Sequence, residues 1–232
     1  MTRRTKILAT LGPSTDDPEI LRRLILSGVN VVRINLSHGS ADDHQKRIEL
    51  LQQITSELEH PVGVVADLQG PKIRIASFAA GSVELKEGAS FTIDTNLGED
   101  DGNQEAVGCH YPDLHRDMSA GDRLLLDDGR LVLEVDAIEN ECVRCHVAIG
   151  GTLSGHKGIN RQGGGLSAKA LTPKDLEDIK LAAKMEVDYL AISFVRSAHD
   201  IYQAKQMLHK AGALKCGIIA KIERQEALDN IE

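Results

Sequence analysis

Apolar runs alternate with one-sided helical patterns along the first seventy residues of the chain. Near-continuous apolar runs at residues 5–11, 29–36 and 62–66 predict buried strands. Between them, apolar residues recur at spacings of three and four, which predicts two helices, the first capped by Ser14 or Thr15. The helical faces are Ile20, Leu21, Leu24 and Ile25, then Ile48, Leu51, Ile54 and Leu58. Buried strands that alternate with helices are typical of a parallel sheet.

The pattern changes after Gly70-Pro71, where short runs with a period of two replace the helical spacing. Gly, Asp and Asn residues separate these runs, as expected for turns between antiparallel strands. The alternating positions are Val83/Leu85, Phe91/Ile93, Leu124/Leu126, Leu131/Leu133/Val135 and Val143/Cys145/Val147. We therefore expect a small all-β barrel or sandwich inserted at residues 71–166, between segments 1–70 and 167–232 of a host domain.

The strand and helix alternation returns near residue 171. Thr172 precedes a predicted helix, and strands are expected at 187–194 and 217–222 around a helix at 201–211, with a further helix from Glu226. Five such steps allow an open five-stranded sheet, but they favour an incomplete (β/α)8 barrel with about five of its eight strands. The predicted fold class is therefore α/β, with an inserted small all-β barrel.

The 232 residues carry 27 Lys and Arg against 35 Asp and Glu, a net charge of −8. Residues 77–141 hold 16 of the acidic and only 4 of the basic residues, so anion-binding chemistry is expected mainly in the flanking segments. Net acidity disfavours nucleic acid as a partner. The 41% apolar content excludes intrinsic disorder, and no apolar run is long enough for a membrane span or a secretory signal. A cytoplasmic protein is expected.

The four cysteines are too few to indicate a disulfide framework. Residues 142–146 spell the haem-attachment pattern C-x-x-C-H, and Cys109, His110, Cys142 and Cys145 offer zinc ligand types. Zinc is disfavoured because strand residues three apart face opposite sides, and haem because the stretch lies in a β-like run of a chain with no predicted export signal. Both remain alternatives to a role in the core.

Polar side chains cluster where three of the predicted strands end, which is where barrel enzymes place their catalytic groups. They are Arg33, Asn35 and Ser37 after the second strand, Asp67 after the third, and Lys221 with Glu223 after the fifth. Each could be explained alone by a structural ion pair, such as Lys221 with Glu223. Together they suit a phosphorylated, metal-bound substrate, because Arg and Lys bind phosphate oxygens and carboxylates hold Mg²⁺.

Eight motifs in a fixed order resemble the N-terminal half of the pyruvate kinase family, over essentially all 232 residues. They lie at 4–13, 33–39, 67–74, 127–129, 157–160, 171–175, 192–196 and 220–223. The resemblance implies phosphoryl transfer from phosphoenolpyruvate to ADP, which gives pyruvate and ATP in glycolysis. It also implies a homotetramer in the complete family member, and a mobile lid formed by the inserted domain.

The resemblance further implies roles for individual residues. Arg33 corresponds to the substrate-phosphate arginine, and Lys221 to the lysine that stabilises charge on the transferring phosphoryl group. The nucleotide-phosphate contacts would be Asn35, His38, Arg74 and Lys157. Glu223 would be a ligand of Mg²⁺ or Mn²⁺. A monovalent-cation site would use Asn35, Ser37, Asp67 and the carbonyl of Leu68.

The chain departs from the family pattern at residue 72, where Lys replaces an acidic residue of many members. We expect the Lys72 ammonium to substitute for the bound K⁺, so that activity needs no K⁺; a surface lysine without a cation role is the alternative. A second departure, the run at residues 160–165 in place of Asn-Leu-Pro-Gly, suggests a looser hinge.

The family's second Mg²⁺ carboxylate is expected beyond Glu232, so this chain alone should be inactive or nearly so, and prone to aggregate. Two alternatives to the kinase remain. One is a short non-catalytic homologue that binds nucleotide or pairs with a full-length subunit. The other is a Mg²⁺-dependent barrel lyase that acts on phosphoenolpyruvate or pyruvate.

Overall fold

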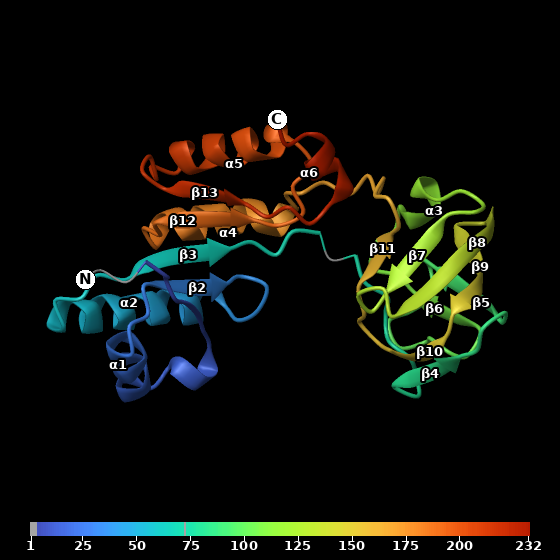
Figure 1. Ribbon diagram of the computed structural model, residues 1–232, viewed down its shortest axis with the longest axis horizontal. Helices are drawn as coiled ribbons and strands as arrows, with labels where there is room; N and C mark the ends of the chain where they lie inside the picture. Colours follow the sequence, from blue (N-terminus) through green and yellow to red (C-terminus); the bar gives the residue numbers. More distant parts are fainter. Residues whose placement is uncertain (1–3, 72) are drawn as a thin grey trace. The chain divides into compact units, whose positions relative to one another are not determined.

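The computed structural model describes residues 4–71 and 73–232, which form two compact units (Figure 1). The first, here called the sheet–helix unit, comprises the described residues up to Pro71 together with Lys169–Glu232. The second, here called the β unit, runs from residue 73 to Ala168. No helix among the described residues is long and apolar enough to cross a membrane.

The sheet–helix unit is built on five strands in the order β1-β2-β3-β12-β13, and every neighbouring pair is parallel. The strands are β1 (Leu8–Leu11), β2 (Val31–Asn35), β3 (Gly63–Asp67), β12 (Tyr189–Ile192) and β13 (Gly217–Ala220). β3 pairs directly with β12, with Val65 opposite Tyr189, although the whole β unit separates them in sequence. All five carboxyl ends therefore lie along one edge of the sheet.

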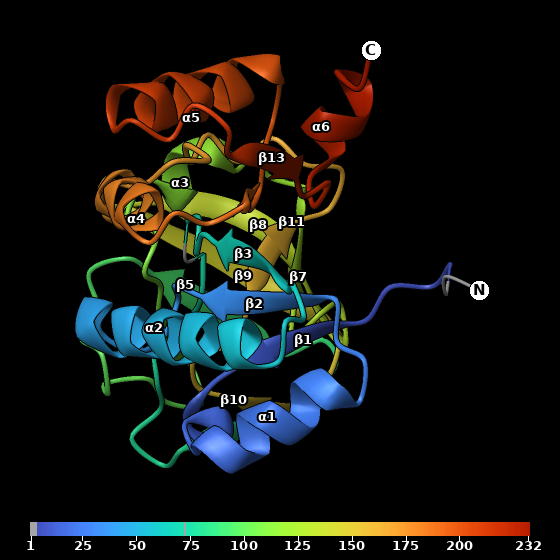
Figure 2. The same ribbon diagram turned by 90° about the vertical axis from the view of Figure 1, so that its left-hand side faces the viewer.

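Helices connect these strands, and Figure 2 shows α2, α4 and α5 stacked one above another along the sheet. The helices are η1 (Pro13–Thr15), α1 (Pro18–Leu26), α2 (Ala41–Glu57), α4 (Pro173–Lys184), α5 (Ala198–Lys210) and α6 (Gln225–Asp229). Ser40 caps α2 and Thr172 caps α4, each in a capping box with an aspartate three residues later. These caps satisfy backbone N–H groups that the helices themselves leave unpaired.

Several predicted element bounds differ from the structure, and three of the differences have a local cause. The cap of α1 is Asp17, since Thr15 bonds the backbone of Gly12 and forms a short 3-10 turn instead. The strand expected at 187–194 ends at Ile192, because Phe194 adopts a left-handed backbone with φ 55°. The helix expected at 201–211 begins earlier, at Ala198, where Ser197 accepts a hydrogen bond from the His199 amide.

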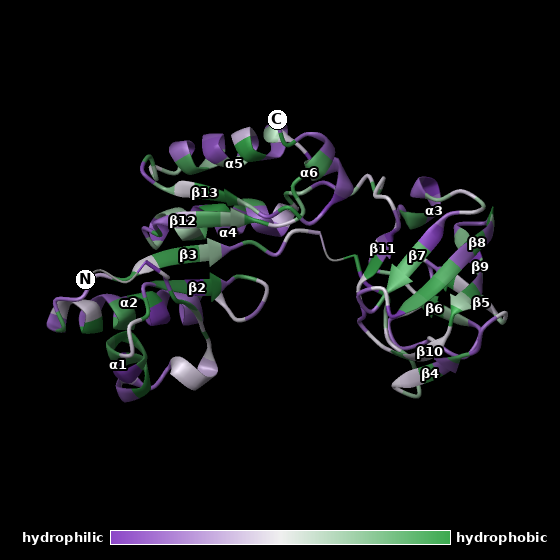
Figure 3. Ribbon diagram, in the orientation of Figure 1, coloured by the Kyte–Doolittle hydropathy of each residue, from purple (hydrophilic) through white to green (hydrophobic). Residues whose placement is uncertain are grey.

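The core of this unit joins the buried faces of the helices to the strands. In α2, Ile48, Leu51 and Ile54 are each 1% exposed, which confirms the predicted face. In α1 only Leu21 and Ile25 are buried, while Ile20 is 39% exposed. Figure 3 shows the corresponding pattern, with β2 and β3 largely hydrophobic and polar residues interspersed along α1 and α2.

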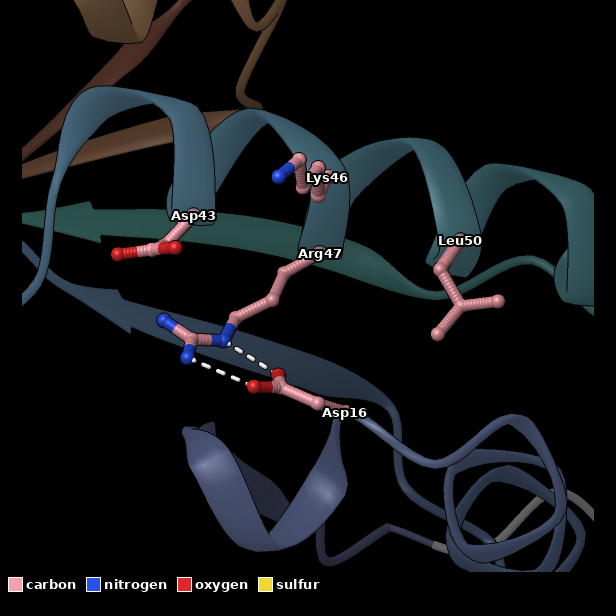
Figure 4. Close-up of a pocket in the computed structure, with 5 residues that line it drawn as sticks. All are labelled: Asp16, Asp43, Lys46, Arg47 and Leu50. Carbon is pink, nitrogen blue, oxygen red and sulfur yellow. Dashed lines mark hydrogen bonds and ion pairs between the residues drawn. The ribbon is translucent and has the colours of Figure 1, made fainter.

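An ion pair ties the loop after β1 to α2 beside a shallow pocket (Figure 4). The Arg47 guanidinium donates to both carboxylate oxygens of Asp16, at 2.6 and 3.0 Å. This hydrogen bonding lowers the pKa of Asp16 below its usual value. Asp43, Lys46 and Leu50 line the same pocket.

The β unit has its own core and consists of strands with one four-residue helix. Its main sheet has six strands in the order β11-β7-β8-β9-β5-β6, and β4 pairs with β10. The elements are β4 (Ser82–Leu85), β5 (Ser90–Asp94), β6 (Ala106–Gly108), α3 (Leu114–Asp117), β7 (Arg123–Leu126), β8 (Leu131–Glu139), β9 (Cys142–Ile149), β10 (Gly151–Ser154) and β11 (Ile159–Arg161). Each alternating apolar position named from the sequence is buried.

Candidate active site

The carboxyl ends of β2, β3 and β13 bring three of the predicted site residues together. Arg33 lies on β2, Asp67 is the last residue of β3, and Lys221 directly follows β13. Parallel pairing places these strand ends at one edge, and Ser193 joins them from the end of β12. The sheet topology therefore brings residues that are far apart in the sequence into one cluster.

Asp67 is the centre of this cluster. Its Oδ2 atom accepts a hydrogen bond from Arg33 Nε at 2.7 Å, and Arg33 NH2 lies 2.7 Å from the same oxygen. Its Oδ1 atom is 3.3 Å from Lys221 Nζ. Asp67 is only 5% exposed, so this carboxylate is buried between two cations. Burial of the charge is tolerated because both carboxylate oxygens are paired.

Three polar groups of the chain surround the Lys221 ammonium. Besides Asp67, Nζ donates to Ser193 Oγ at 2.8 Å and lies 3.3 Å from Glu223 Oε1. Ser193 Oγ in turn donates to the carbonyl of Leu68 at 2.7 Å. Glu223 Oε2 accepts a hydrogen bond from the backbone N–H of Phe194 at 3.0 Å. The ammonium is thereby held at one point of the sheet edge.

The other predicted site residues lie in several environments. Asn35 is opposite Asp67 in the strand register, and its Oδ1 accepts a hydrogen bond from the Ser37 amide at 3.2 Å. His38 is exposed in the loop that follows. Leu68 is buried and presents its carbonyl to Ser193. The structure thus places Asn35, Asp67 and Leu68 of the expected monovalent-cation set around the end of β3, with the Ser37 amide bonded to Asn35.

Two predicted nucleotide contacts belong to the β unit, and one predicted residue is not described. Lys157 Nζ is 2.8 Å from Asp127 Oδ1. Arg74 forms an isolated antiparallel bridge with Gly158. Lys72 lies outside the described residues. The structure therefore brings Arg33, Asn35, Asp67, Lys221 and Glu223 to one edge, while Arg74 and Lys157 lie near one another in the other unit.

Two residues of the cluster were missed by the sequence analysis as site residues. Thr10 pairs with Arg33 in the register of β1 and β2, and its Oγ1 accepts a hydrogen bond from Arg33 NH1 at 3.2 Å. Ser193 connects Lys221 to Leu68. Both are hydroxyl residues at the end of an otherwise apolar strand. That position could have singled them out, because a hydroxyl there is costly without a partner.

Comparison with known proteins gives the same family over the whole chain. Residues 2–232 match the family "Pyruvate kinase, barrel domain". A "Pyruvate kinase" of Buchnera aphidicola subsp. Schizaphis graminum is 52% identical over 226 residues, which are 97% of this chain and 47% of that protein. "Pyruvate kinase II" of Salmonella typhimurium is 48% identical over 97% of this chain and 47% of its own length. The chain belongs to the pyruvate kinase family.

The same coverage holds for more distant members. A "Pyruvate kinase" of Mycobacterium tuberculosis is 42% identical over the whole of this chain and 48% of its own length. The chain therefore spans about half the length of the curated pyruvate kinases it matches. Membership of this family sets aside the alternative of a separate barrel lyase.

The structure places the cysteines considered from the sequence in separate environments. Burial raises the pKa of the Cys109 thiol to about 11 and that of the Cys145 thiol to about 12, so both are protonated at neutral pH. Cys142 is on the other face of β9 and is only half-buried. His146 Nδ1 lies 2.7 Å from Asp136 Oδ1 instead. Among the described residues these cysteines do not gather with a histidine.

Gly70 is a position where an added methyl group should damage the cluster. It has φ +67°, and a Cβ there would lie 2.9 Å from Phe194 Cδ2 and 3.0 Å from Ser193 Cβ. We expect Gly70→Ala to lower the free energy of unfolding by about 2–4 kcal/mol, from backbone strain and overlap together. Urea unfolding followed by helical circular dichroism measures this.

Gly212→Ala is the matched control for Gly70→Ala within the same unit. Gly212 has φ +88°, but a Cβ there would meet nothing within 4 Å. Its cost should be limited to the backbone term of about 1 kcal/mol. Equal losses in the two variants would show that the contact with Ser193 and Phe194 is unimportant.

Proposed function

We propose that this chain carries the first part of a pyruvate kinase active site, which transfers the phosphoryl group of phosphoenolpyruvate to ADP. The observation that supports this is the pairing of Arg33 and Lys221 around one buried carboxylate, Asp67, at the carboxyl edge of the sheet. Phosphoryl transfer depends on positioned cations, because charge develops on the oxygens of the transferring group.

Arg33 is proposed to bind the phosphate of phosphoenolpyruvate. Its Nε and NH2 atoms face Asp67, and NH1 donates to Thr10, so the guanidinium plane is fixed. A guanidinium has five N–H donors, and these three contacts leave others for a ligand. The fork geometry of arginine matches two oxygens of a phosphate group.

Lys221 is proposed to stabilise negative charge on the phosphoryl group during transfer. Its contacts with Asp67, Ser193 and Glu223 fix the ammonium before substrate binds. A charge that is already oriented needs little reorganisation in the transition state. Its side chain is about one third exposed, so a substrate oxygen can reach it.

Glu223 fits the requirements of a Mg²⁺ ligand. Its side chain is 34% exposed, and its Oε1 atom lies 3.3 Å from Lys221 Nζ. Mg²⁺ binds through one or two carboxylates together with substrate phosphates and water, and when bound it neutralises charge on those phosphates. Mn²⁺ has the same preference for oxygen ligands.

The remaining roles follow from the family resemblance and are part of the proposal. Asn35 and His38, with Arg74 and Lys157 of the β unit, would contact the phosphates of ADP, and the β unit would act as a lid. Asn35, Ser37, Asp67 and Leu68 would supply the monovalent-cation oxygens, with Lys72 replacing K⁺. A homo-oligomer is proposed for the complete protein. These 232 residues alone should convert phosphoenolpyruvate only slowly. In the described cluster Asp67 is already paired with Arg33 and Lys221, so Glu223 is the carboxylate left accessible to Mg²⁺.

The test is a chimera in which these 232 residues replace the matching 47% of the Schizaphis graminum symbiont's pyruvate kinase. We expect pyruvate formation that requires phosphoenolpyruvate, ADP and Mg²⁺, and that persists without K⁺. The separate 232-residue chain is expected to show no more than about 1% of that rate, because Glu223 alone is a poor Mg²⁺ site. A folded chimera that binds ADP without turnover would instead support the non-catalytic homologue.

A further inference from the structure

Three side chains with metal-binding chemistry face one another in the β unit, and none of them is among the residues proposed for the active site. They are Glu99 in the loop between β5 and β6, His110 just after β6, and His156 in the loop between β10 and β11. One ligand atom from each lies within 4.8 Å of the others. These residues come from three separate stretches of the chain, so their convergence is a product of the fold.

The distances suit a shared ion. His110 Nε2 is 2.6 Å from Glu99 Oε2, and His156 Nδ1 is 3.4 Å from Glu99 Oε1. The two imidazole ring centres are 6.3 Å apart. A tetrahedral zinc ion with bonds of about 2.1 Å holds its ligand atoms roughly 3.4 Å from one another. Since all three side chains are exposed, small rotations about their χ angles are enough to reach that arrangement.

The backbone of each ligand residue is anchored to the same short segment, residues 74–77. The His110 amide donates to the carbonyl of Arg74 at 2.9 Å, and the His156 amide donates to the carbonyl of Ala76 at 3.1 Å. The Ser77 amide donates to the carbonyl of Glu99 at 2.7 Å. One segment therefore fixes the backbone of all three ligand residues. This reduces the conformational entropy that is lost when an ion binds.

The turn that carries His156 has a strained backbone and packs closely against Ser77. His156 adopts a left-handed backbone with φ 62°, which costs free energy for a residue other than glycine. The preceding Gly155 lies so close to Ser77 that a Cβ would be 2.8 Å from its Oγ atom. The close approach and the strained φ together aim the imidazole towards Glu99.

We propose that Glu99, His110 and His156 form a binding site for a divalent transition-metal ion of the zinc class, with water in the remaining position. Two imidazoles and one carboxylate select zinc and similar ions over Mg²⁺, which prefers an all-oxygen set. Asp100 and Asp101 follow Glu99 and add negative charge that attracts a cation. None of the three residues belongs to the set proposed for phosphoryl transfer, and the site does not depend on the proposed function.

The experiment is a competition titration of the 232-residue chain with Zn²⁺ and a chromophoric chelator. We expect one Zn²⁺ ion per chain, and we expect His110→Gln and His156→Gln each to weaken binding about ten-fold or more, in the range seen when metal coordination is perturbed. His146→Gln is the matched control, because this exposed histidine of the same unit also pairs with a carboxylate, Asp136. It should change the affinity less than about two-fold, as a histidine outside the site.

Co²⁺ as a second probe distinguishes this site from the cysteines. Its visible spectrum should show nitrogen and oxygen ligation without a thiolate charge-transfer band, and the band pattern should disappear in the double histidine variant. Thermal unfolding of each variant checks that the fold is retained. Absence of Zn²⁺ binding, a thiolate band, or unchanged binding in the folded double variant would each overturn the proposal.

Discussion

Replacing Lys221 with methionine should lower kcat for pyruvate formation by the chimera about 10²–10³-fold, because a preorganised charge at the transferring group is removed. Methionine keeps most of the apolar stem and loses only the ammonium that contacts Asp67, Ser193 and Glu223. KM for phosphoenolpyruvate should change much less than kcat, since Arg33 remains. Steady-state kinetics at saturating Mg²⁺ measures both constants.

The matched control is Lys180→Met on α4. Lys180 is exposed and pairs with Glu177 at 2.8 Å on the same helix, away from the cluster. Its kcat should stay within about two-fold of the parent chimera, since exposed ion pairs contribute little. A folded Lys221→Met chimera with unchanged kcat would refute the role assigned to this lysine.

Replacing Asp67 with asparagine should lower the free energy of unfolding of the sheet–helix unit by about 3 kcal/mol. The change keeps the side-chain shape but leaves Arg33 and Lys221 facing each other without the carboxylate between them. Because the long helices all belong to this unit, helical circular dichroism during urea unfolding reports on it.

Glu177→Gln on α4 provides the comparison for this prediction, because it lies in the same unit and is read by the same signal. Glu177 also pairs with a basic side chain, Lys180, at 2.8 Å, but its side chain is 71% exposed. Solvent screens such a pair, so its removal should cost less than about 1 kcal/mol. If Asp67→Asn proved as mild as Glu177→Gln, the buried carboxylate would not be what holds the two cations in place.

The sequence pattern predicted the strands and helices well where a single periodicity dominates. The helical repeat alone predicted the burial of Ile48, Leu51 and Ile54. The period of two alone predicted the burial of the alternating residues of the β unit. Ile20 was wrongly expected to be buried, because the repeat does not define how wide the covered face of a short helix is. The strand before Phe194 is shorter than predicted because this residue adopts a left-handed backbone. Its N–H donates to Glu223, a residue distant in sequence, and local hydrophobic periodicity does not reveal such a contact.

The sequence predicted which residues belong to the candidate site, but not which of them contact one another. Arg33, Asp67 and Lys221 stood out as charged residues at strand ends, but their contacts depend on which strands are neighbours. Ser193 became part of the cluster only because β12 lies between β3 and β13. In the β unit, His110 was considered beside cysteines. The structure places it beside Glu99 and His156, because the alternation of the strand buries Cys109 and leaves His110 exposed.

The pairing of β3 with β12 has a consequence for how the chain is made. Roughly 100 residues separate Pro71 from Lys169, and a ribosome adds about 5–20 residues per second. After β3 has been synthesised, about 5–20 s therefore pass before its partner strand β12 emerges, and during this time the edge of β3 is unpaired. During that time its unpaired backbone can join strands of other nascent chains. The β unit has a hydrophobic core of its own, so the unpaired edge exposed during this interval is that of the sheet formed by β1, β2 and β3.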